Sequence, residues 1–263
     1  MKPVIIKSNE DIARMKQSGK LLARVFSALD DYIQVGQTTM AVNDFVESYI
    51  TEQLGAVAST KGQYGYPYAI NVSVNDVVCH GMPKASQKIK NSDILNVDIT
   101  LKHDGFLADS SKMYVMPDAA PLARKLTNET YKAMWEGIKL VKPGVKLGDI
   151  GHAIQSYAER HGYSVVREFC GHGIGTEMHE GPDVLHFGQK DTGLTLQAGM
   201  TFTIEPMINQ GTHKVKTLKD GWTVVTKDKK LSAQWEHTIL VTENGYEVLT
   251  LRHDESLPCM PSH

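Results

Sequence analysis

The chain has 263 residues, of which 41% are hydrophobic, and its formal net charge at pH 7 is −2. This length can bury one large hydrophobic core or two smaller ones, and the small net charge provides no overall field that would favour nucleic acid or anionic lipid. No apolar run reaches the roughly 20 residues that a membrane-spanning helix requires.

Two helices are predicted near the N-terminus. The first opens with a capping pattern, Ser8 followed three residues later by Asp11, and apolar residues then recur at helical spacing over residues 12–33. Gly36 is expected to end it. A second helix is predicted over about residues 40–53.

The next segments predict loops and strands. Thr60–Tyr68 is rich in glycine and tyrosine and is expected to be a loop, whereas alternation over Ala69–Val78 predicts a strand. Two further extended runs, Ile94–Thr100 and Phe106–Val115, flank a strong turn signal at Lys102–Gly105 and predict a hairpin.

This hairpin is expected to place two aspartates opposite each other. With the turn centred on His103 and Asp104, Asp98 pairs with Asp109, and directly opposed side chains lie only about 5 Å apart at Cβ. Two buried carboxylates this close repel each other, so the pattern favours a pair of divalent metal ions beside them. A solvated hairpin face is the alternative, because a register slip changes the facing pair.

The second half predicts two more helices and then strands. One helix starts at Pro121 and closes before Gly144, and the other spans Leu147–His161. Thr201–Glu205 alternates like a strand. Trp222–Thr226 and Ser232–Val241 flank a lysine-rich turn and predict another hairpin.

The two helical regions look like copies of each other. At a constant offset of 108 residues (144 minus 36), Gly36 matches Gly144 and Tyr49 matches Tyr157. We interpret this as a diverged duplication of two α+β halves that form one sheet-centred domain. Any two helical hairpins with glycine stops would share part of this pattern.

Further candidate ligands lie in stiff or apolar contexts. His172 lies between glycines, where the backbone can approach a ligand closely. Glu205 and Glu236 lie in apolar strands, where a carboxylate is rarely buried without a partner, although a single strand glutamate is more typical of an exposed face. With Asp98 and Asp109 these glutamates carry −4, which two divalent ions would neutralise. Carboxylates with one imidazole suit Mn, Fe, Co or Zn.

Two histidines occupy short rigid motifs. His80 and His179 are each followed within three residues by glycine and proline. In a metal hydrolase they could donate hydrogen bonds to a developing oxyanion or to the leaving nitrogen, although each alone is more typical of a loop histidine. The histidines interpreted as bystanders are His103, His186 and His213.

Several of these motifs occur together in the order and spacing of a known family. They are Asn96–Thr100, Asp109–Lys112, Cys170–Gly175, Thr203–Met207 and Ser232–Thr238. In these motifs the chain resembles the type I methionine aminopeptidases, from the first helix to about Leu251. The resemblance implies an α/β (α+β) pita-bread (creatinase/aminopeptidase) fold, with pseudo-two-fold duplicated halves around a central, mostly antiparallel sheet. We expect a single catalytic domain over residues 1–263, with halves at about 8–115 and 116–251.

The resemblance also implies a dinuclear metal site. The residues that match its ligands are Asp98, Asp109, His172, Glu205 and Glu236. Asp109 and Glu236 would bridge two divalent ions (Co, Mn, Fe, Zn or Ni, with the identity left open). Glu205 would also act as the catalytic residue that takes a proton from water.

The same resemblance implies a substrate site. His179 would stabilise the oxyanion, and His80 would contact the leaving amide nitrogen, so both are catalytic and substrate-binding candidates. Tyr66, Trp222 and Met178 would line the pocket for an unbranched thioether. This chain departs from the family in that pocket, where Thr60, Gln63 and Asn71 replace cysteines and an aromatic residue, and Met178 replaces phenylalanine. Other departures are Lys84, Ala108 and Ser110.

Other partners follow from the resemblance. A monovalent cation would bind near Asn75, Val77 and Ser232, partly through backbone oxygens. Ribosome binding is expected only if a lysine-rich surface such as Lys214–Lys219 or Lys227–Lys230 supplies it, and such turns are usually just solvated. The protein is expected to be a monomer without membrane contact.

A cytoplasmic location is expected. The first eight residues turn polar too soon for a signal peptide. The cysteines, Cys79, Cys170 and Cys259, are odd in number and show no Cys-x-x-Cys spacing, which argues against a disulfide framework and against zinc held by cysteine.

The predicted function is removal of the N-terminal methionine from nascent polypeptides with a small second residue. One alternative is another pita-bread aminopeptidase with relaxed or altered specificity. Such enzymes usually carry an additional N-terminal domain, which is not expected here. The other alternative is a catalytically weak binding paralogue.

Overall fold

The computed structural model describes residues 2–256 of the chain, so Cys259 lies outside the described part. Its helices are α1 (Asn9–Tyr32), α2 (Thr39–Ser48), α3 (Pro121–Ile138) and α4 (Leu147–Arg160), with a π-helical turn η1 (Tyr49–Gln53) continuing α2 and a 3₁₀ turn η2 (Gln63–Gly65). The predicted capping box is confirmed, because Ser8 Oγ accepts a hydrogen bond from the Asp11 N–H and the Asp11 carboxylate accepts one from the Ser8 N–H. Within residues 2–256, no helix is both long and apolar enough to cross a bilayer.

The strands are short except for the central hairpin. They are β1 (Val57–Ala58), β2 (Asn71–Val74), β3 (Val77–Cys79), β4 (Ile94–His103), β5 (Phe106–Val115), β6 (Ser164–Val165), β7 (Gly171–Gly173), β8 (Glu180–Val184), β9 (Thr201–Ile204), β10 (Met207–Asn209), β11 (Val215–Thr217), β12 (Val224–Thr226), β13 (Ser232–Gln234), β14 (His237–Val241) and β15 (Tyr246–Val248). Every pairing between these strands is antiparallel, as predicted.

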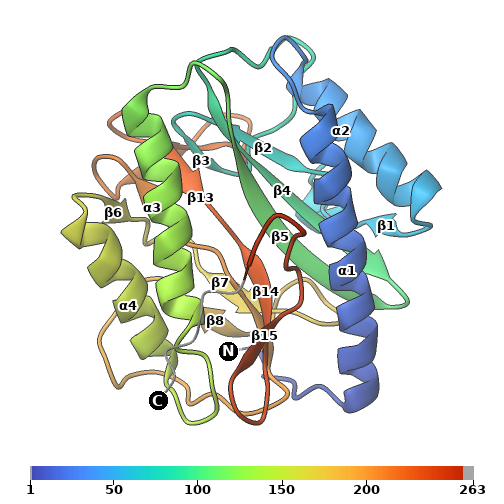
Figure 1. The fold of residues 1–263 in the computed structure, drawn as a ribbon, viewed down its shortest axis with the longest axis vertical. Helices are drawn as coiled ribbons and strands as arrows, with labels where there is room; N and C mark the ends of the chain where they lie inside the picture. Colours follow the sequence, from blue (N-terminus) through green and yellow to red (C-terminus); the bar gives the residue numbers. More distant parts are fainter. Residues whose placement is uncertain (1, 257–263) are drawn as a thin grey trace.

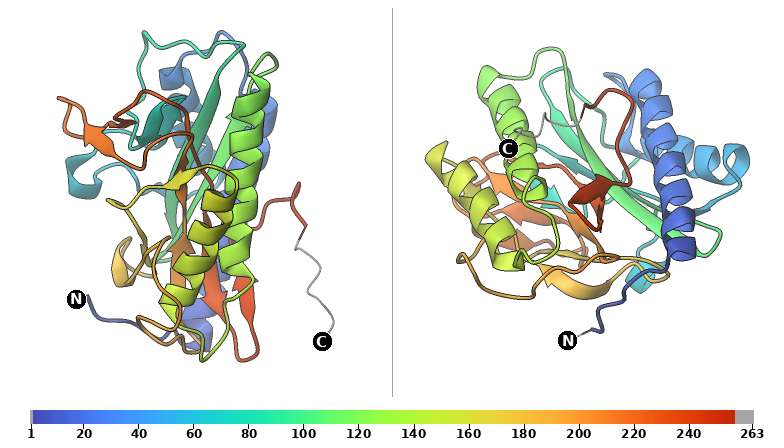
Figure 2. Two further views of the ribbon diagram at one scale, coloured as in Figure 1. Left: turned by 90° about the vertical axis from the view of Figure 1, so that its left-hand side faces the viewer. Right: turned by 60° about the horizontal axis from the view of Figure 1, so that its bottom comes forward.

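The helices cover one side of the sheets (Figures 1 and 2). β4 pairs with β5 along one edge and with β1 and β2 along the other, and a second sheet has the order β15-β14-β9-β7-β8. α1 packs on β4 and β5, whereas α3 packs on β13 and β5 beside α4. β11 and β12 project from the opposite side (Figure 2).

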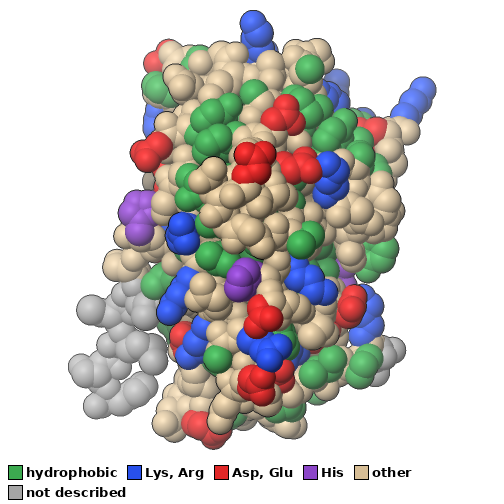
Figure 3. All heavy atoms as spheres, turned by 90° about the vertical axis from the view of Figure 1, so that its right-hand side faces the viewer, with side chains coloured by type: hydrophobic (Ala, Val, Ile, Leu, Met, Phe, Trp, Pro, Cys, Tyr) green, Lys and Arg blue, Asp and Glu red, His purple; other side chains and the backbone are tan. Residues whose placement is uncertain are grey.

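Two main hydrophobic cores lie between these layers. One unites α1 and α2 with β2 and β4 through residues such as Phe26 and Val97. The other unites α3 and α4 with β9 through residues such as Trp135, Ile154 and Phe202. On the face over α1 and α2, charged side chains of both signs are interspersed with small hydrophobic areas (Figure 3). The two cores fit the idea of two halves, whose bounds stay a prediction.

The turn of the central hairpin differs from the predicted one. Asp104 and Gly105 form the turn with φ values of 46° and 82°, and His103 pairs with Phe106. Positive φ at both central residues matches the right-handed twist of the flanking strands and suits an Asp-Gly pair. The loop is therefore tighter than a turn centred on His103 and Asp104.

The predicted direct pairing of the two aspartates is consequently wrong. Asp98 lies opposite Ser111, and Asp109 lies opposite Thr100. Because side chains alternate along a strand with a period of two, a register shift of two residues leaves both aspartates on the same face of the sheet. They are diagonal neighbours instead of a facing pair.

Two other strand predictions are also corrected. The run Ala69–Val78 is broken at Asn75, where φ is 56°, so β2 pairs with β4 while β3 pairs with β12. The predicted hairpin of Trp222–Thr226 with Ser232–Val241 does not form, because β12 pairs with β11 and β3, and β13 pairs with β10. In both cases a single predicted pattern is divided between different partner strands.

Candidate active site

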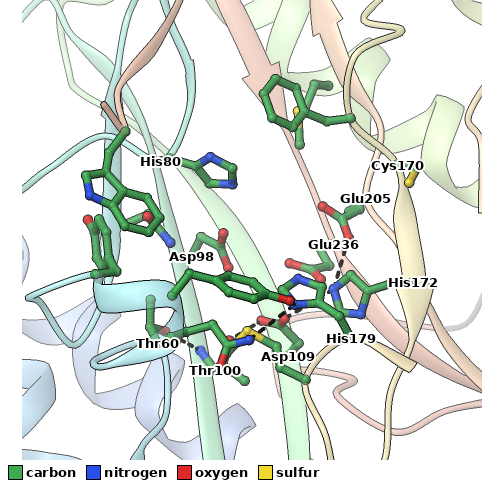
Figure 4. A pocket seen from close by; sticks show the side chains of 18 of the residues that line it. Thr60, His80, Asp98, Thr100, Asp109, Cys170, His172, His179, Glu205 and Glu236 are labelled. Carbon is green, nitrogen blue, oxygen red and sulfur yellow. Dashed lines mark hydrogen bonds and ion pairs between the residues drawn. The ribbon is translucent and has the colours of Figure 1, made fainter. Parts of the chain in front are cut away.

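One cavity of about 330 Å³ collects all the predicted metal ligands and substrate-binding residues, whereas Asn75, Val77 and Ser232 lie outside its lining. Its lining includes Thr60, Gln63, Tyr66, Asn71, His80, Asp98, Asp109, His172, Met178, His179, Glu205, Trp222 and Glu236. Figure 4 shows the carboxylates and His172 directed toward a common space, with His80 and His179 beside it. The structure therefore brings these side chains together around one space.

Each candidate ligand comes from a different element. Asp98 lies on β4, Asp109 on β5 and His172 on β7, while Glu205 directly follows β9 and Glu236 lies between β13 and β14. β4 and β5 belong to one sheet, whereas β7, β9 and β14 belong to another, so the cluster exists only where these sheets meet. The alternative that Glu205 lies on an exposed strand face does not hold, because Glu205 is buried and β9 is paired on both sides.

A backbone bridge holds Glu236 against the central hairpin. The Glu236 N–H donates to the carbonyl oxygen of Ser111 at 3.3 Å, and the Ser110 hydroxyl donates to the Glu236 carbonyl oxygen at 2.6 Å. This contact places Glu236 near Asp109, and ligand atoms of Asp109, His172 and Glu236 all lie within 4.8 Å of one another.

Hydroxyl and amide groups orient the ligand side chains. Thr100 donates to Oδ1 of Asp109 at 2.9 Å. Thr203 donates to Oε1 of Glu205 at 2.8 Å, and the Gln234 amide lies 3.3 Å from Oε2 of the same carboxylate. Nε2 of His172 lies 3.7 Å from Asp109 Oδ2 and 3.6 Å from Glu205 Oε1. The carboxylates of Asp109 and Glu205 are thereby held in position while keeping oxygen lone pairs for another partner.

Burial makes this cluster costly without a cation. It raises the pKa of Asp109 from 3.8 to about 7. Burial and the charge of Asp109 raise the pKa values of Asp98, Glu205 and Glu236 above their usual ranges. Burial also lowers the pKa of His172 to about 3, so its imidazole is neutral and able to bind a metal. Hard oxygen donors with one neutral nitrogen fit divalent transition ions.

A second group of possible metal ligands does not need a metal. Asp30, His253 and Asp254 lie close together, but Lys112 already holds the two aspartates, with Nζ at 2.8 Å and 2.7 Å from their oxygens. This lysine supplies the positive charge that a metal would otherwise provide.

The two predicted substrate histidines lie on opposite walls of the cavity (Figure 4). His80 has a φ of 55° and packs edge-on against Phe169, and burial lowers its pKa. His179 stacks on Tyr64, whose hydroxyl lies 3.2 Å from its Nδ1, and burial lowers the pKa of His179 to about 4. Both rings are therefore neutral at pH 7, and a neutral imidazole can still donate one N–H.

Aromatic side chains shape the remaining wall. Tyr66 meets Trp222 edge to face with ring centroids 5.0 Å apart. The Tyr66 hydroxyl donates to the backbone carbonyl oxygens of Ile70 or Gly81, each 3.1 Å away, so it is directed away from the cavity. The exposed part of Tyr66 is its apolar ring.

Comparison with known proteins now decides the family. The model of metallopeptidase family M24 matches residues 13–243. The chain belongs to metallopeptidase family M24.

Its M24 relatives match almost end to end. A methionine aminopeptidase of Salmonella typhimurium is 48% identical over 260 residues, which cover 99% of this chain and 98% of that protein. The methionine aminopeptidase of Escherichia coli K12 is 45% identical with the same coverage. A crystal structure of methionine aminopeptidase from Rickettsia prowazekii superposes with a TM-score of 0.93 at 47% identity, covering 95% of this chain and 100% of that one.

A more distant solved structure supports the fold alone. Prolidase from Pyrococcus furiosus superposes with a TM-score of 0.76 at 21% identity, covering 95% of this chain and 66% of that one. The predicted resemblance to methionine aminopeptidases and the predicted pita-bread fold are both confirmed by these matches.

Sequence reasoning missed several residues of this M24 site. His186 was interpreted as a bystander, but its buried Nε2 accepts a hydrogen bond from the Glu205 N–H at 3.0 Å. Tyr64 and Phe169 also line the cavity. His186 follows Val184 and Leu185 in an apolar stretch, and that context could have signalled burial, whereas the loop residues Tyr64 and Phe169 carry no comparable signal.

Proposed function

We propose that this chain is a metal-dependent aminopeptidase that removes N-terminal methionine from polypeptides with a small second residue. The observation that carries the proposal is the buried convergence of four carboxylates and one neutral imidazole in a chain that aligns end to end with methionine aminopeptidases. Among residues 2–256, Lys2 is the only lysine or arginine in the cavity lining, and its single positive charge does not balance four carboxylates.

We assign the metal ligands to Asp98, Asp109, His172, Glu205 and Glu236. Asp109 and Glu236 are the bridging candidates, because ligand atoms of both lie within 4.8 Å of each other and of His172. Two bound divalent ions would supply Lewis acidity and a water molecule that ionises near neutral pH. The ligand set accommodates Co, Mn, Fe, Zn or Ni without selecting one.

Glu205 is the candidate general base. Thr203 and Gln234 hold its two oxygens, which fixes the direction in which the carboxylate can take a proton. In the metal-free protein, burial and the charge of Asp109 raise the pKa of Glu205, and bound cations would lower it again so that the carboxylate is ionised and able to accept a proton. The proton it accepts can later be passed to the leaving nitrogen.

His179 and His80 are the candidate hydrogen-bond donors to the substrate. Tyr64 and His172 hold the ring of His179 from two sides, which favours a fixed direction for its N–H toward a developing oxyanion. His80 lies on the opposite wall, where it can contact the amide nitrogen that leaves. Tyr66, Trp222 and Met178 offer apolar surface to an unbranched thioether.

A monovalent cation near Asn75, Val77 and Ser232 would stabilise the backbone next to the cavity. The Ser232 N–H donates to the Asn75 carbonyl oxygen at 2.9 Å, so these backbones are adjacent. The buried Ser232 hydroxyl has no hydrogen-bond partner among the described residues. A cation beside these oxygens would fix the start of β13, which leads to Glu236.

We place the enzyme in the cytoplasm as a monomer, because its substrates would be chains emerging from the ribosome. The exposed lysines of Lys214–Lys219 and Lys227–Lys230 lie beside β11 and β12 and offer a contact for ribosomal RNA. Co-sedimentation with ribosomes at increasing salt tests this contact, and binding that is unaffected by reversing these charges would refute it.

Hydrolysis of Met-Ala-Ser with added Mn or Co tests the function. We expect cleavage by the parent chain and a loss of at least about 100-fold in Glu205→Gln, because the general base is removed. Glu136→Gln, at a partly exposed residue of α3 outside the cavity lining, is the matched control. Turnover only of substrates with proline would favour another pita-bread peptidase, and metal binding without turnover of any peptide would favour a binding paralogue.

A further inference from the structure

One wall of the cavity carries polar groups that the reaction does not use. Asn71 lies opposite Asp98 in the β2–β4 pair, so its side chain is on the sheet face that carries the candidate ligands. Asn71 is 8% exposed and lines the cavity. Among residues 2–256, its side-chain amide has no hydrogen-bond partner, so a buried donor group faces the space that a substrate would fill.

Thr60 adds a second donor beside it. Its Oγ1 accepts a hydrogen bond from the Thr100 N–H at 3.0 Å, which fixes the side chain, and the residue is 7% exposed (Figure 4). Within the described residues, the hydroxyl hydrogen of Thr60 has no acceptor. The wall therefore presents an N–H group and an O–H group that both lack protein acceptors.

A methionine thioether satisfies these donors poorly. Thioether sulfur is only a weak hydrogen-bond acceptor, so closing the cavity over methionine would desolvate both donors without replacing their bonds to water. The opposite wall, formed by the rings of Tyr66 and Trp222, remains apolar and suits an unbranched chain. The cavity thus combines an apolar side with a side that carries hydrogen-bond donors without acceptors.

Methionine sulfoxide has this combination. Its oxygen is a strong acceptor on the sulfur of the same unbranched chain, and oxidation makes the sulfur polar and chiral.

Building on the function proposed above, we propose that this enzyme also removes N-terminal methionine sulfoxide, using Asn71 and Thr60 as donors to the sulfoxide oxygen. The reaction is the same hydrolysis: water adds across the first peptide bond, free methionine sulfoxide and the shortened peptide leave, and the sulfur keeps its oxidation state. Because both donors lie on one side of the cavity, the two sulfur epimers are cleaved at different rates.

The test compares Met-Ala-Ser, its two separated sulfoxide epimers and norleucine-Ala-Ser as substrates of the parent chain. We expect kcat/KM for the better epimer to be within about tenfold of that for methionine. Asn71→Leu, similar in size but without polar atoms, should lower kcat/KM for the sulfoxide about tenfold more than for methionine. Asn71→Gln keeps the amide and should retain more of the preference, and Asn91→Leu, at an exposed residue outside the cavity lining, should change neither.

The outcomes separate the two proposals. If no methionine peptide is cleaved, the function itself fails. If methionine is cleaved but both sulfoxide epimers are cleaved no faster than norleucine, or if Asn71→Leu lowers all substrates equally, the sulfoxide proposal is overturned. Calorimetry of free methionine sulfoxide and norleucine binding provides a readout without turnover, in which the parent should prefer the sulfoxide and Asn71→Leu should lose that preference.

Discussion

The backbone N–H of Glu205 donates a hydrogen bond to Nε2 of His186, 3.0 Å away. Burial lowers the pKa of His186 to about 3, so the ring is neutral at pH 7 and its remaining proton is on Nδ1. This bond fixes the backbone at the point where β9 ends and the candidate base begins. A residue outside the cavity therefore positions Glu205.

Removing this acceptor is expected to slow the reaction. His186→Phe leaves the Glu205 N–H unpaired, which should cost about 1–3 kcal/mol of unfolding free energy. The kcat on Met-Ala-Ser should fall about tenfold, with a smaller change in KM, as for other groups that orient site residues. His186→Gln restores an acceptor and should recover part of kcat, whereas His213→Phe, in a loop outside the cavity lining, should change little. An unchanged kcat in His186→Phe would contradict the positioning role.

The acidic cluster predicts how the stability of the metal-free protein depends on pH. Burial raises the pKa of Asp109 from 3.8 to about 7, so the folded state binds more protons than the unfolded state between these values. Stability contributed by this group is therefore present below pH 3.8 and is lost as pH rises toward 7. Thermal unfolding after chelation should show Tm falling over this range, and Asp109→Asn should flatten the fall. The same slope in the variant would refute the assignment.

Metal binding should reverse that loss. Divalent ions bind the ionised carboxylates of the folded protein, so added Mn or Co should raise Tm more at pH 8 than at pH 5. Glu236→Gln should reduce this rise, because it removes a bridging candidate, while Glu136→Gln on α3 should not. Metal-to-protein ratios measured on the same samples show whether Tm follows occupancy. A rise in Tm that is equal at both pH values would contradict metal binding by the ionised carboxylates.

A buried ion pair ties the N-terminal segment to the loop that ends at His179. Lys7 Nζ lies 2.6 Å from Glu180 Oε2, and both side chains are almost fully buried. Lys7→Met leaves the carboxylate unpaired and should cost about 3–5 kcal/mol of unfolding free energy, with a further loss of kcat as the loop loosens.

Two further variants serve as controls for Lys7→Met. Adding Glu180→Gln to Lys7→Met removes the uncompensated charge and should recover much of the stability. Lys61 and Glu47 form a partly exposed pair, so Lys61→Met should cost less than about 1 kcal/mol. Denaturant unfolding measures all three variants, and similar losses in Lys7→Met and Lys61→Met would refute the prediction.

Arg252 is linked to the metal-ligand candidate Glu236 through Ser110. It is 2% exposed, and it donates to Ser110 Oγ at 2.9 Å and to Glu255 at 2.8 Å. Because Ser110 in turn donates to the Glu236 carbonyl oxygen, Arg252→Met should cost about 3 kcal/mol of unfolding free energy or more and should also weaken metal retention. Arg24→Met, on the exposed side of α1, is the control. Full stability of Arg252→Met would contradict this reading.

Local sequence patterns predicted the helices because their signals are local. The capping box of Ser8 and Asp11 forms within one turn, and Pro121 begins α3 as predicted. The run Ser232–Val241 failed as one strand, since the bridge between Ser111 and Glu236 and the pairing of β13 with β10 depend on segments far away in the chain. No local pattern contains that information.

The sequence alone determined which side chains are available. They are carboxylates and a histidine in apolar or glycine-rich settings, whose summed charge favours cations and whose motifs indicate the family. Only the tertiary structure decided that Asp98 and Asp109 are diagonal neighbours, that His186 holds the backbone of Glu205, and that Asn71 faces the cavity without a partner. The physical reason is that residue type and alternation are properties of the chain, whereas register and long-range hydrogen bonds are set by packing between sheets.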